Sequence, residues 1–249
     1  MGFPRMGVFM ASESGEWIMH GVDWDAPGCI HTAGEAMEYI HKIGFLPLFR
    51  NDIPGFSLEE HTASNDWWSG EPKADPWIWR EAIARTGEIA YGKFFDKKAG
   101  FISREWFPYF ANYRRDGYDF DARWEDGLAS VRHKRIMDLF EDQEQLYSYE
   151  IKKNAGYGKG GEKNFEGMIT ALQMQTYLCM KDFKRRRNKR GEEYGWNIAI
   201  YSRPEQLWGY DYVTSRYCEE PEASWSRMLE HAEELYPAAE EKQLRKVLK

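Results

Sequence analysis

The sequence predicts an α+β protein that is mainly helical and contains a winged helix-turn-helix unit, or two in tandem, with small β-hairpins. Three helical patterns follow one another between residues 131 and 180, and the third is the longest. Two extended runs joined by a polar turn come next, at 182–202, and the turn is rich in arginine and lysine. Helix, helix, longer helix and hairpin is the element order of a winged helix.

Apolar residues at three- and four-residue intervals place the helices of this unit. We expect the first helix at 131–140 and a brief second helix at 143–153. A link rich in glycine and lysine leads to the third helix, at 165–180. The hairpin should turn at 188–191.

Length and turn residues divide the chain into four predicted parts. A chain of 249 residues can form one large domain or two small ones. Proline and glycine close the first stretch, before the helical patterns begin. The predicted parts are an irregular N-terminal segment (1–31), an N-terminal domain of helices and a hairpin (32–127), a winged-helix domain (128–202) and C-terminal helices packed on the body (203–249).

Capping residues mark two helices in the predicted N-terminal domain. Thr32 and Gly44 fit the N-cap and C-cap of one amphipathic helix, and Asp75 and Gly87 fit the same positions in a second. We further expect a hairpin with its turn at 96–100, a helix that ends in a tight turn at 116–117, and two C-terminal helices, the first beginning at Pro221 and separated from the second by Pro237.

Composition and motifs argue against several classes of protein. No run approaches the roughly 18 apolar residues that span a bilayer, and the N-terminus lacks a signal-peptide pattern, so we expect a cytoplasmic protein. The three cysteines share no CxxC spacing, and the acidic run at 116–126 lacks the spacing of an EF-hand. We therefore expect no metal and no cofactor.

Positive charge gathers in one part of an acidic chain. Residues 151–190 contain eleven lysines and arginines against three acidic residues, a net charge of +8, whereas the rest of the chain carries −15. One basic face on an acidic body is typical of a protein that binds a polyanion at one place. The alternative is a solvated charge run on an exposed turn. The candidate nucleic-acid-binding residues are Lys159, Lys163, Lys184, Arg185, Arg186, Arg187, Lys189 and Arg190.

The expected partner is double-stranded DNA. Because the third helix has few long cationic side chains on its outer face, it is poorly equipped for bidentate contacts with guanine. We therefore expect recognition of the phosphate backbone or of DNA shape, with the basic hairpin as the anchor.

Gln173 and Gln175 form a second candidate site, with one apolar residue between them. Residues two apart on a helix point about 200° away from each other, so the two amides share a pocket only if the helix ends or distorts there. Converging amides can hold a water molecule for attack on a strained base, although an amide is no general base at neutral pH. The alternative is one exposed glutamine and one bonded to neighbouring backbone.

The glutamine pair beside a winged-helix pattern resembles the signature of the AlkZ (YcaQ-like) DNA glycosylases. From Ile43 onward, the stretches IGFLPLF, DPWIWR, AYGKFFDKKAGFIS, WFPYFANYRRDGYDFD and LQMQTYL also look like those of bacterial AlkZ-related proteins. The resemblance implies winged helices around bound DNA, with Gln173 and Gln175 positioning the attacking water. It also implies a DNA-repair enzyme that hydrolyses the N-glycosidic bond of an alkylated or otherwise damaged base.

Three functions remain open at this point. A glycosylase that flips a base needs aromatic walls, which Trp106, Tyr109, Tyr113 or Trp196 can supply. A winged-helix protein without catalysis would instead act as a DNA-binding regulator or accessory factor. An interaction module would use the basic hairpin to bind an acidic protein.

Overall fold

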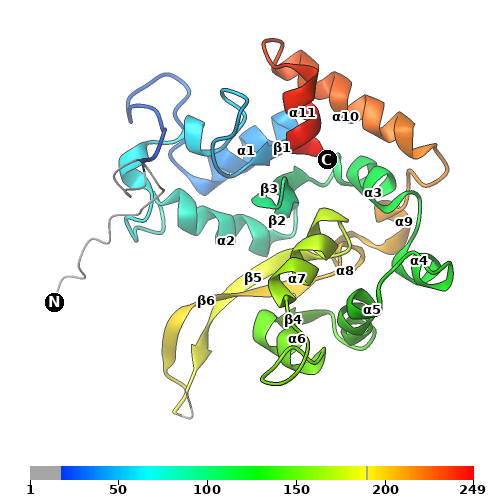
Figure 1. Ribbon diagram of the computed structural model, residues 1–249. Helices are drawn as coiled ribbons and strands as arrows, with labels where there is room; N and C mark the ends of the chain where they lie inside the picture. Colours follow the sequence, from blue (N-terminus) through cyan, green and yellow to red (C-terminus); the bar gives the residue numbers. More distant parts are fainter. Residues whose placement is uncertain (1–17, 189) are drawn as a thin grey trace.

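One antiparallel sheet runs through the described part of the protein. The computed structural model describes residues 18–188 and 190–249, without the side chain of Arg187. The predictions for residues 1–17, for Lys189 and for the Arg187 side chain therefore lie outside the described residues. The sheet has six strands in the order β1-β3-β2-β5-β6-β4 (Figure 1). The strands are β1 (Phe45–Pro47), β2 (Ile89–Phe95), β3 (Lys98–Ser103), β4 (Gln145–Tyr147), β5 (Cys179–Arg187) and β6 (Glu193–Ser202).

Helices surround this sheet, and the structure confirms an α+β architecture (Figure 1). No helix in the described ranges is both long enough and apolar enough to cross a membrane. The α-helices are α1 (Ala33–Ile43), α2 (Pro76–Thr86), α3 (Phe107–Arg115), α4 (Phe120–Glu125), α5 (Val131–Met137), α6 (Ser148–Asn154), α7 (Phe165–Met174), α8 (Pro204–Trp208), α9 (Tyr210–Val213), α10 (Pro221–Leu235) and α11 (Glu241–Leu248). Short 3-10 helices are η1 (Glu59–His61), η2 (Ser64–Asp66) and η3 (Asp138–Phe140).

The capping residues act as the sequence predicts. The Thr32 side chain accepts a hydrogen bond from the backbone N–H of Glu35 at 3.2 Å and begins α1. Asp75 begins α2 by accepting from the N–H of Trp77 at 2.9 Å. The glycine after each helix has a positive φ, which suits a residue without Cβ.

The first predicted hairpin is confirmed, with a tighter turn than expected. Asp96 and Lys97 have φ values of 46° and 63° and alone connect β2 to β3. Two consecutive left-handed residues are typical of the type I′ turn, whose twist matches that of the strands. The remaining residues of the predicted turn, 98–100, belong to β3.

The predicted second helix of the winged-helix segment is wrong at its beginning. Residues 145–147 form strand β4, which pairs with the end of β6 through Leu146 and Tyr201. Leu146 is buried while Gln145 beside it is exposed, so the segment follows the two-residue period of a strand. Only α6, which follows directly, is helical here.

The predicted third helix ends six residues early. Helix α7 stops at Met174, Gln175 is its C-cap, and Thr176 has a left-handed φ of 62°. The apolar residues 177–180 continue the helical spacing, but the first two connect α7 to β5 and the last two belong to β5. Tertiary contacts to Thr176 explain this change of direction.

The buried guanidinium of Arg115, at the end of α3, fixes that turn. Its Nη2 donates to the carbonyl oxygen of Thr176 at 2.7 Å and its Nε donates to the hydroxyl at 3.1 Å. Its Nη1 lies 2.5 Å from Oε1 of Glu205, on α8, and 3.2 Å from the hydroxyl of Tyr217. Burial raises the pKa of Tyr217 to about 12, so this phenol stays protonated and donates to the carbonyl of Tyr118.

The two predicted C-terminal helices are confirmed and contact the N-terminal half of the chain. Helix α10 packs on α3 (Figure 1). His231, on α10, stacks on Trp106 with ring centroids 4.2 Å apart and hydrogen-bonds the carbonyl of Ile43. Arg114 donates to the carbonyl of Leu248 at 2.7 Å and ties α11 to α3.

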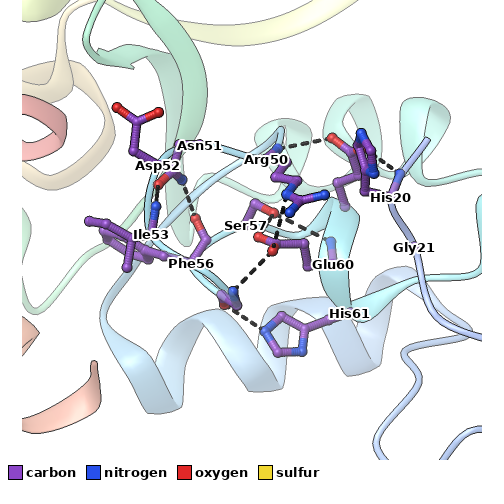
Figure 2. Close-up of polar contacts among 12 residues, drawn as sticks. His20, Gly21, Arg50, Asn51, Asp52, Ile53, Phe56, Ser57, Glu60 and His61 are labelled. Atoms are coloured by element: carbon purple, nitrogen blue, oxygen red, sulfur yellow. Dashed lines mark hydrogen bonds and ion pairs between the residues drawn. The ribbon is translucent and has the colours of Figure 1, made fainter. Parts of the chain in front are cut away.

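A network of carboxylates holds the loop between β1 and α2. Glu59 is buried and accepts from the backbone N–H groups of His20 and Arg50 at 2.7 and 2.9 Å. Glu60 accepts from the hydroxyl of Ser57 at 2.6 Å, and His61 contacts the carbonyl of Gly55 (Figure 2). Both carboxylate oxygens of Glu59 accept hydrogen bonds from backbone N–H groups, so this cluster has a structural role in holding the loop.

Replacement of Arg115 by methionine should lower the free energy of unfolding by about 3–5 kcal/mol, because Glu205 and the Thr176 turn lose a buried charged partner. Urea unfolding followed by circular dichroism measures this change. Arg216→Met is the matched control, since Arg216 forms an exposed ion pair with Glu219 and should cost at most about 1 kcal/mol. Equal losses in the two variants would show that the Arg115 network is dispensable.

Candidate nucleic-acid interface

Exposed lysines and arginines lie on three neighbouring segments: α6, the loop that follows it, and the β5–β6 hairpin. The hairpin projects from the body, and α6 lies beside its base (Figure 1). We call these side chains the basic surface. Its members are Lys152, Lys153, Lys159, Lys163, Lys184, Arg185, Arg186 and Arg190.

Contacts to two helices hold the hairpin in place. The guanidinium of Arg186 lies 4.9 Å from the ring centroid of Tyr149 and links β5 to α6. On β6, the amide of Asn197 donates to Glu81 of α2 at 2.6 Å. The hairpin is therefore anchored to helices from both halves of the chain.

One cation of the basic surface already has a partner. Lys184 lies 3.4 Å from Asp182, whose other oxygen accepts from Arg85 at 2.9 Å. Although burial opposes it, the hydrogen bonds from the Phe183 backbone and from Arg85 lower the pKa of Asp182. Asp182 therefore stays ionised and partly neutralises Lys184, whereas Arg185 and Arg190 are exposed toward the tip.

Basic residues on α5 lie outside this surface. Glu162 pairs with both Arg132 and Arg135, at 3.0 and 3.3 Å. Burial, and then the charge of Arg123, lower the pKa of His133, which is therefore neutral at physiological pH. The helix offers little free positive charge for a phosphate.

Helix α7 corresponds to the predicted third helix, and neighbouring segments cover much of it. Of its ten residues only Glu166 is exposed. The β2–β3 hairpin covers it, with Lys93 donating to Thr170 and the backbone of Lys97 to the sulfur of Met174. The half-buried residues of α7 are Gly167, Met168, Ala171 and Met174, so the accessible part of the helix contains no cation for a DNA phosphate or base.

The two glutamines have different environments. Gln173 is fully buried, its Oε1 accepting from the N–H of Lys93 and its Nε2 donating to the carbonyl of Ile169, each at 3.0 Å. Gln175 is the partly exposed C-cap residue of α7. Both amide atoms of Gln173 thus bond backbone groups, as in the alternative interpretation of the pair.

Three of the four aromatic residues considered for a base pocket pack into the body. Trp106 is 8% exposed and stacks on His231. Tyr109 packs against Trp106, and Tyr113 lies 4.9 Å from the ring of Trp225. Trp196, on β6, differs because 80% of it is exposed.

A cavity of about 300 Å³ lies between α4 and the short helices α8 and α9. Its walls combine aromatic rings with charged groups, and Tyr177 joins it to the turn that follows α7. Sequence inspection missed this site because its residues are up to 91 positions apart, as in the 3.0 Å hydrogen bond from Tyr210 to Asp119. The lining includes Asp119, Phe120, Asp121, Tyr177, Arg203 and Glu205.

A comparison with protein families assigns the chain to a family. A family model described as AlkZ related matches residues 30–249, which contain every strand and helix of the described fold. The chain belongs to the AlkZ-related family. No curated protein and no solved structure matches it.

Membership of the AlkZ-related family confirms the resemblance seen in the sequence, while the catalytic role of Gln173 and Gln175 stays a prediction. The hydrogen bonds of Gln173 give it a separate structural role, since it joins α7 to β2.

Gln173→Leu should lower the free energy of unfolding by about 1–3 kcal/mol, because the buried N–H of Lys93 would lose its acceptor at nearly constant side-chain volume. Urea unfolding measures this effect. Gln175→Leu is the control, and at its partly exposed position should change stability by no more than about 0.5 kcal/mol. A loss confined to the Gln175 variant would contradict the structural role of Gln173.

Proposed function

We propose that this AlkZ-related protein binds double-stranded DNA through a winged-helix unit formed by residues 128–202. The main support for this proposal is the order of the elements together with the pairing of the strands. The order is α5, β4, α6, α7, β5 and β6, and β6 pairs with both β4 and β5. Three helices backed by a small three-stranded sheet, whose hairpin follows the third helix, are the parts of a winged helix.

Charge supports the orientation of this binding. Residues 151–190 carry a net +8 in a chain whose remainder carries −15, so the field of the protein would direct its hairpin side to DNA. Lysine and arginine on the projecting hairpin and beside its base can replace condensed counterions along the phosphate backbone.

The covered α7 determines the expected kind of recognition. Because the one exposed residue of this helix, Glu166, is acidic and its half-buried residues include no cation, the helix is poorly suited to contacts with base edges in the major groove. The hairpin and the loop after α6 are left as the contacting elements. Such binding follows the phosphate backbone and the shape of DNA, and a sequence-independent role as an accessory or repair factor fits it.

Replacement of Arg185, Arg186 and Arg190 by alanine should weaken binding to a short DNA duplex. Fluorescence anisotropy over a salt series measures it, and the slope of log K against log salt should fall by up to about 3, one for each lost phosphate contact. The matched control replaces the exposed Lys42, Lys73 and Lys242, which removes equal charge elsewhere and should leave the slope unchanged. Absence of binding by the wild type at low salt would refute the proposal.

A second function, hydrolysis of the N-glycosidic bond of a damaged base, is favoured by the cavity lined by Tyr177. Aromatic walls can hold a base that has left the stack, and a carboxylate can take the proton of an attacking water. Asp119 is suitably placed, with one oxygen accepting from the N–H of Ala122 and the other from the hydroxyl of Tyr210.

For this second function we expect wild-type protein to produce abasic sites in alkylated duplex DNA, detected as strand breaks after alkali. Asp119→Asn should slow base release about 10²-fold or more while keeping the helix cap and DNA affinity. Asp126→Asn is the control, because Asp126 also accepts from a tyrosine, Tyr118, at 3.0 Å but does not line the cavity. Gln175→Ala tests the motif separately. No product from a panel of lesions would favour the non-catalytic alternative.

A further inference from the structure

An exposed tryptophan stands out on the projecting hairpin. Trp196 is 80% exposed, the highest value among the described large apolar side chains, and Tyr194 on the same strand is 49% exposed. Two solvent-exposed aromatic rings on one strand of a projecting hairpin form a candidate binding surface. Tyr149, 37% exposed on α6, adds a third ring beside the hairpin, where it contacts Arg186.

The backbone of the hairpin is built to present Trp196. Lys184 pairs with Ile198 and Arg186 with Tyr194, so three residues of β6 stand opposite Arg185 alone. Gly195, within this bulge, has a φ of 74°, a conformation that glycine adopts without strain. Bulges of this kind redirect side chains at functional edges.

The residue after Trp196 fixes the strand that carries it. The Asn197 amide donates to Glu81 at 2.6 Å, and Glu81 is itself 3.1 Å from the guanidinium of Arg80. The strand that carries the indole is therefore held by contacts to α2. A fixed attachment point reduces the conformational entropy that is lost on binding.

The surroundings of Trp196 select the chemistry of its ligand. Arg185 stands opposite the bulge, and Arg186 pairs with the neighbouring Tyr194 across the hairpin. An exposed ring on a hairpin whose opposite strand carries exposed arginines matches a ligand with aromatic faces and negative charge, which describes a nucleotide. In an intact duplex those faces are covered by stacking, so only an unpaired base offers one.

We propose that Trp196 stacks on an unpaired or extruded base, so that the protein prefers DNA with such a base to intact duplex. The inference rests on the proposed DNA binding and specifies the DNA structure that is recognised. The arginines hold phosphates of any sequence, whereas the indole detects the exposed base. A stacked base typically strengthens binding about 5- to 150-fold.

The test measures the affinity of the full chain for three DNA probes of similar length by fluorescence anisotropy. The probes are an intact duplex, the same duplex with one unpaired nucleotide, and a single strand. Wild type should bind the probe with the unpaired nucleotide 5- to 150-fold more tightly than the duplex. Trp196→Ala should bring this ratio close to one without changing the salt slope, and Trp196→Phe should keep part of it. Trp24→Ala is the matched control, since Trp24 is 63% exposed in the N-terminal segment.

The variants separate this inference from the proposed function. Loss of Arg185, Arg186 and Arg190 should reduce the salt slope while the preference for the unpaired nucleotide persists. Duplex binding with a wild-type ratio near one, or a ratio that survives Trp196→Ala, would overturn the stacking role alone. Absence of binding to all three probes at low salt would overturn the DNA-binding proposal as well.

Discussion

The fold depends on one buried cation. Arg115 sits at the end of α3 with no exposed side-chain surface, and its guanidinium bonds Thr176, Glu205 and Tyr217. These contacts join α3 to the turn between α7 and β5, to α8 and to the segment between α9 and α10. A charge in this position is stabilised only while all its partners are present, so the network requires one relative arrangement of the segments.

That arrangement separates the basic hairpin from the cavity. Where the Thr176 turn directs the chain into β5, it starts the strand that ends in the basic hairpin, and it places Tyr177 in the cavity wall. The β2–β3 hairpin meanwhile covers α7. The proposed DNA binding would thus use the hairpin and the loop after α6, whereas the proposed chemistry would use the cavity. The turn at Thr176 leads into both sites.

Much of the architecture was predictable because its signals are local. Caps at Thr32 and Asp75, the hairpin around residue 96 and the proline that begins α10 act within a few residues, and each was confirmed. The two wrong boundaries, at β4 and at the end of α7, lie where distant segments override local pattern. Leu146 pairs with a strand 55 residues away, and Thr176 is held by Arg115 from 61 residues away. The family resemblance also followed from sequence and is confirmed.

The sequence by itself determined the helices, the hairpins and the concentration of positive charge, because periodicity, capping and composition are properties of neighbouring residues. The tertiary structure alone decided which groups are available. It buried Gln173 against β2, paired Lys184 with Asp182, left Trp196 exposed on a bulge and assembled a cavity around Asp119 and Glu205. The solvent exposure of a side chain and its contacts with residues distant in sequence depend on how the elements pack. A local sequence pattern does not contain that information.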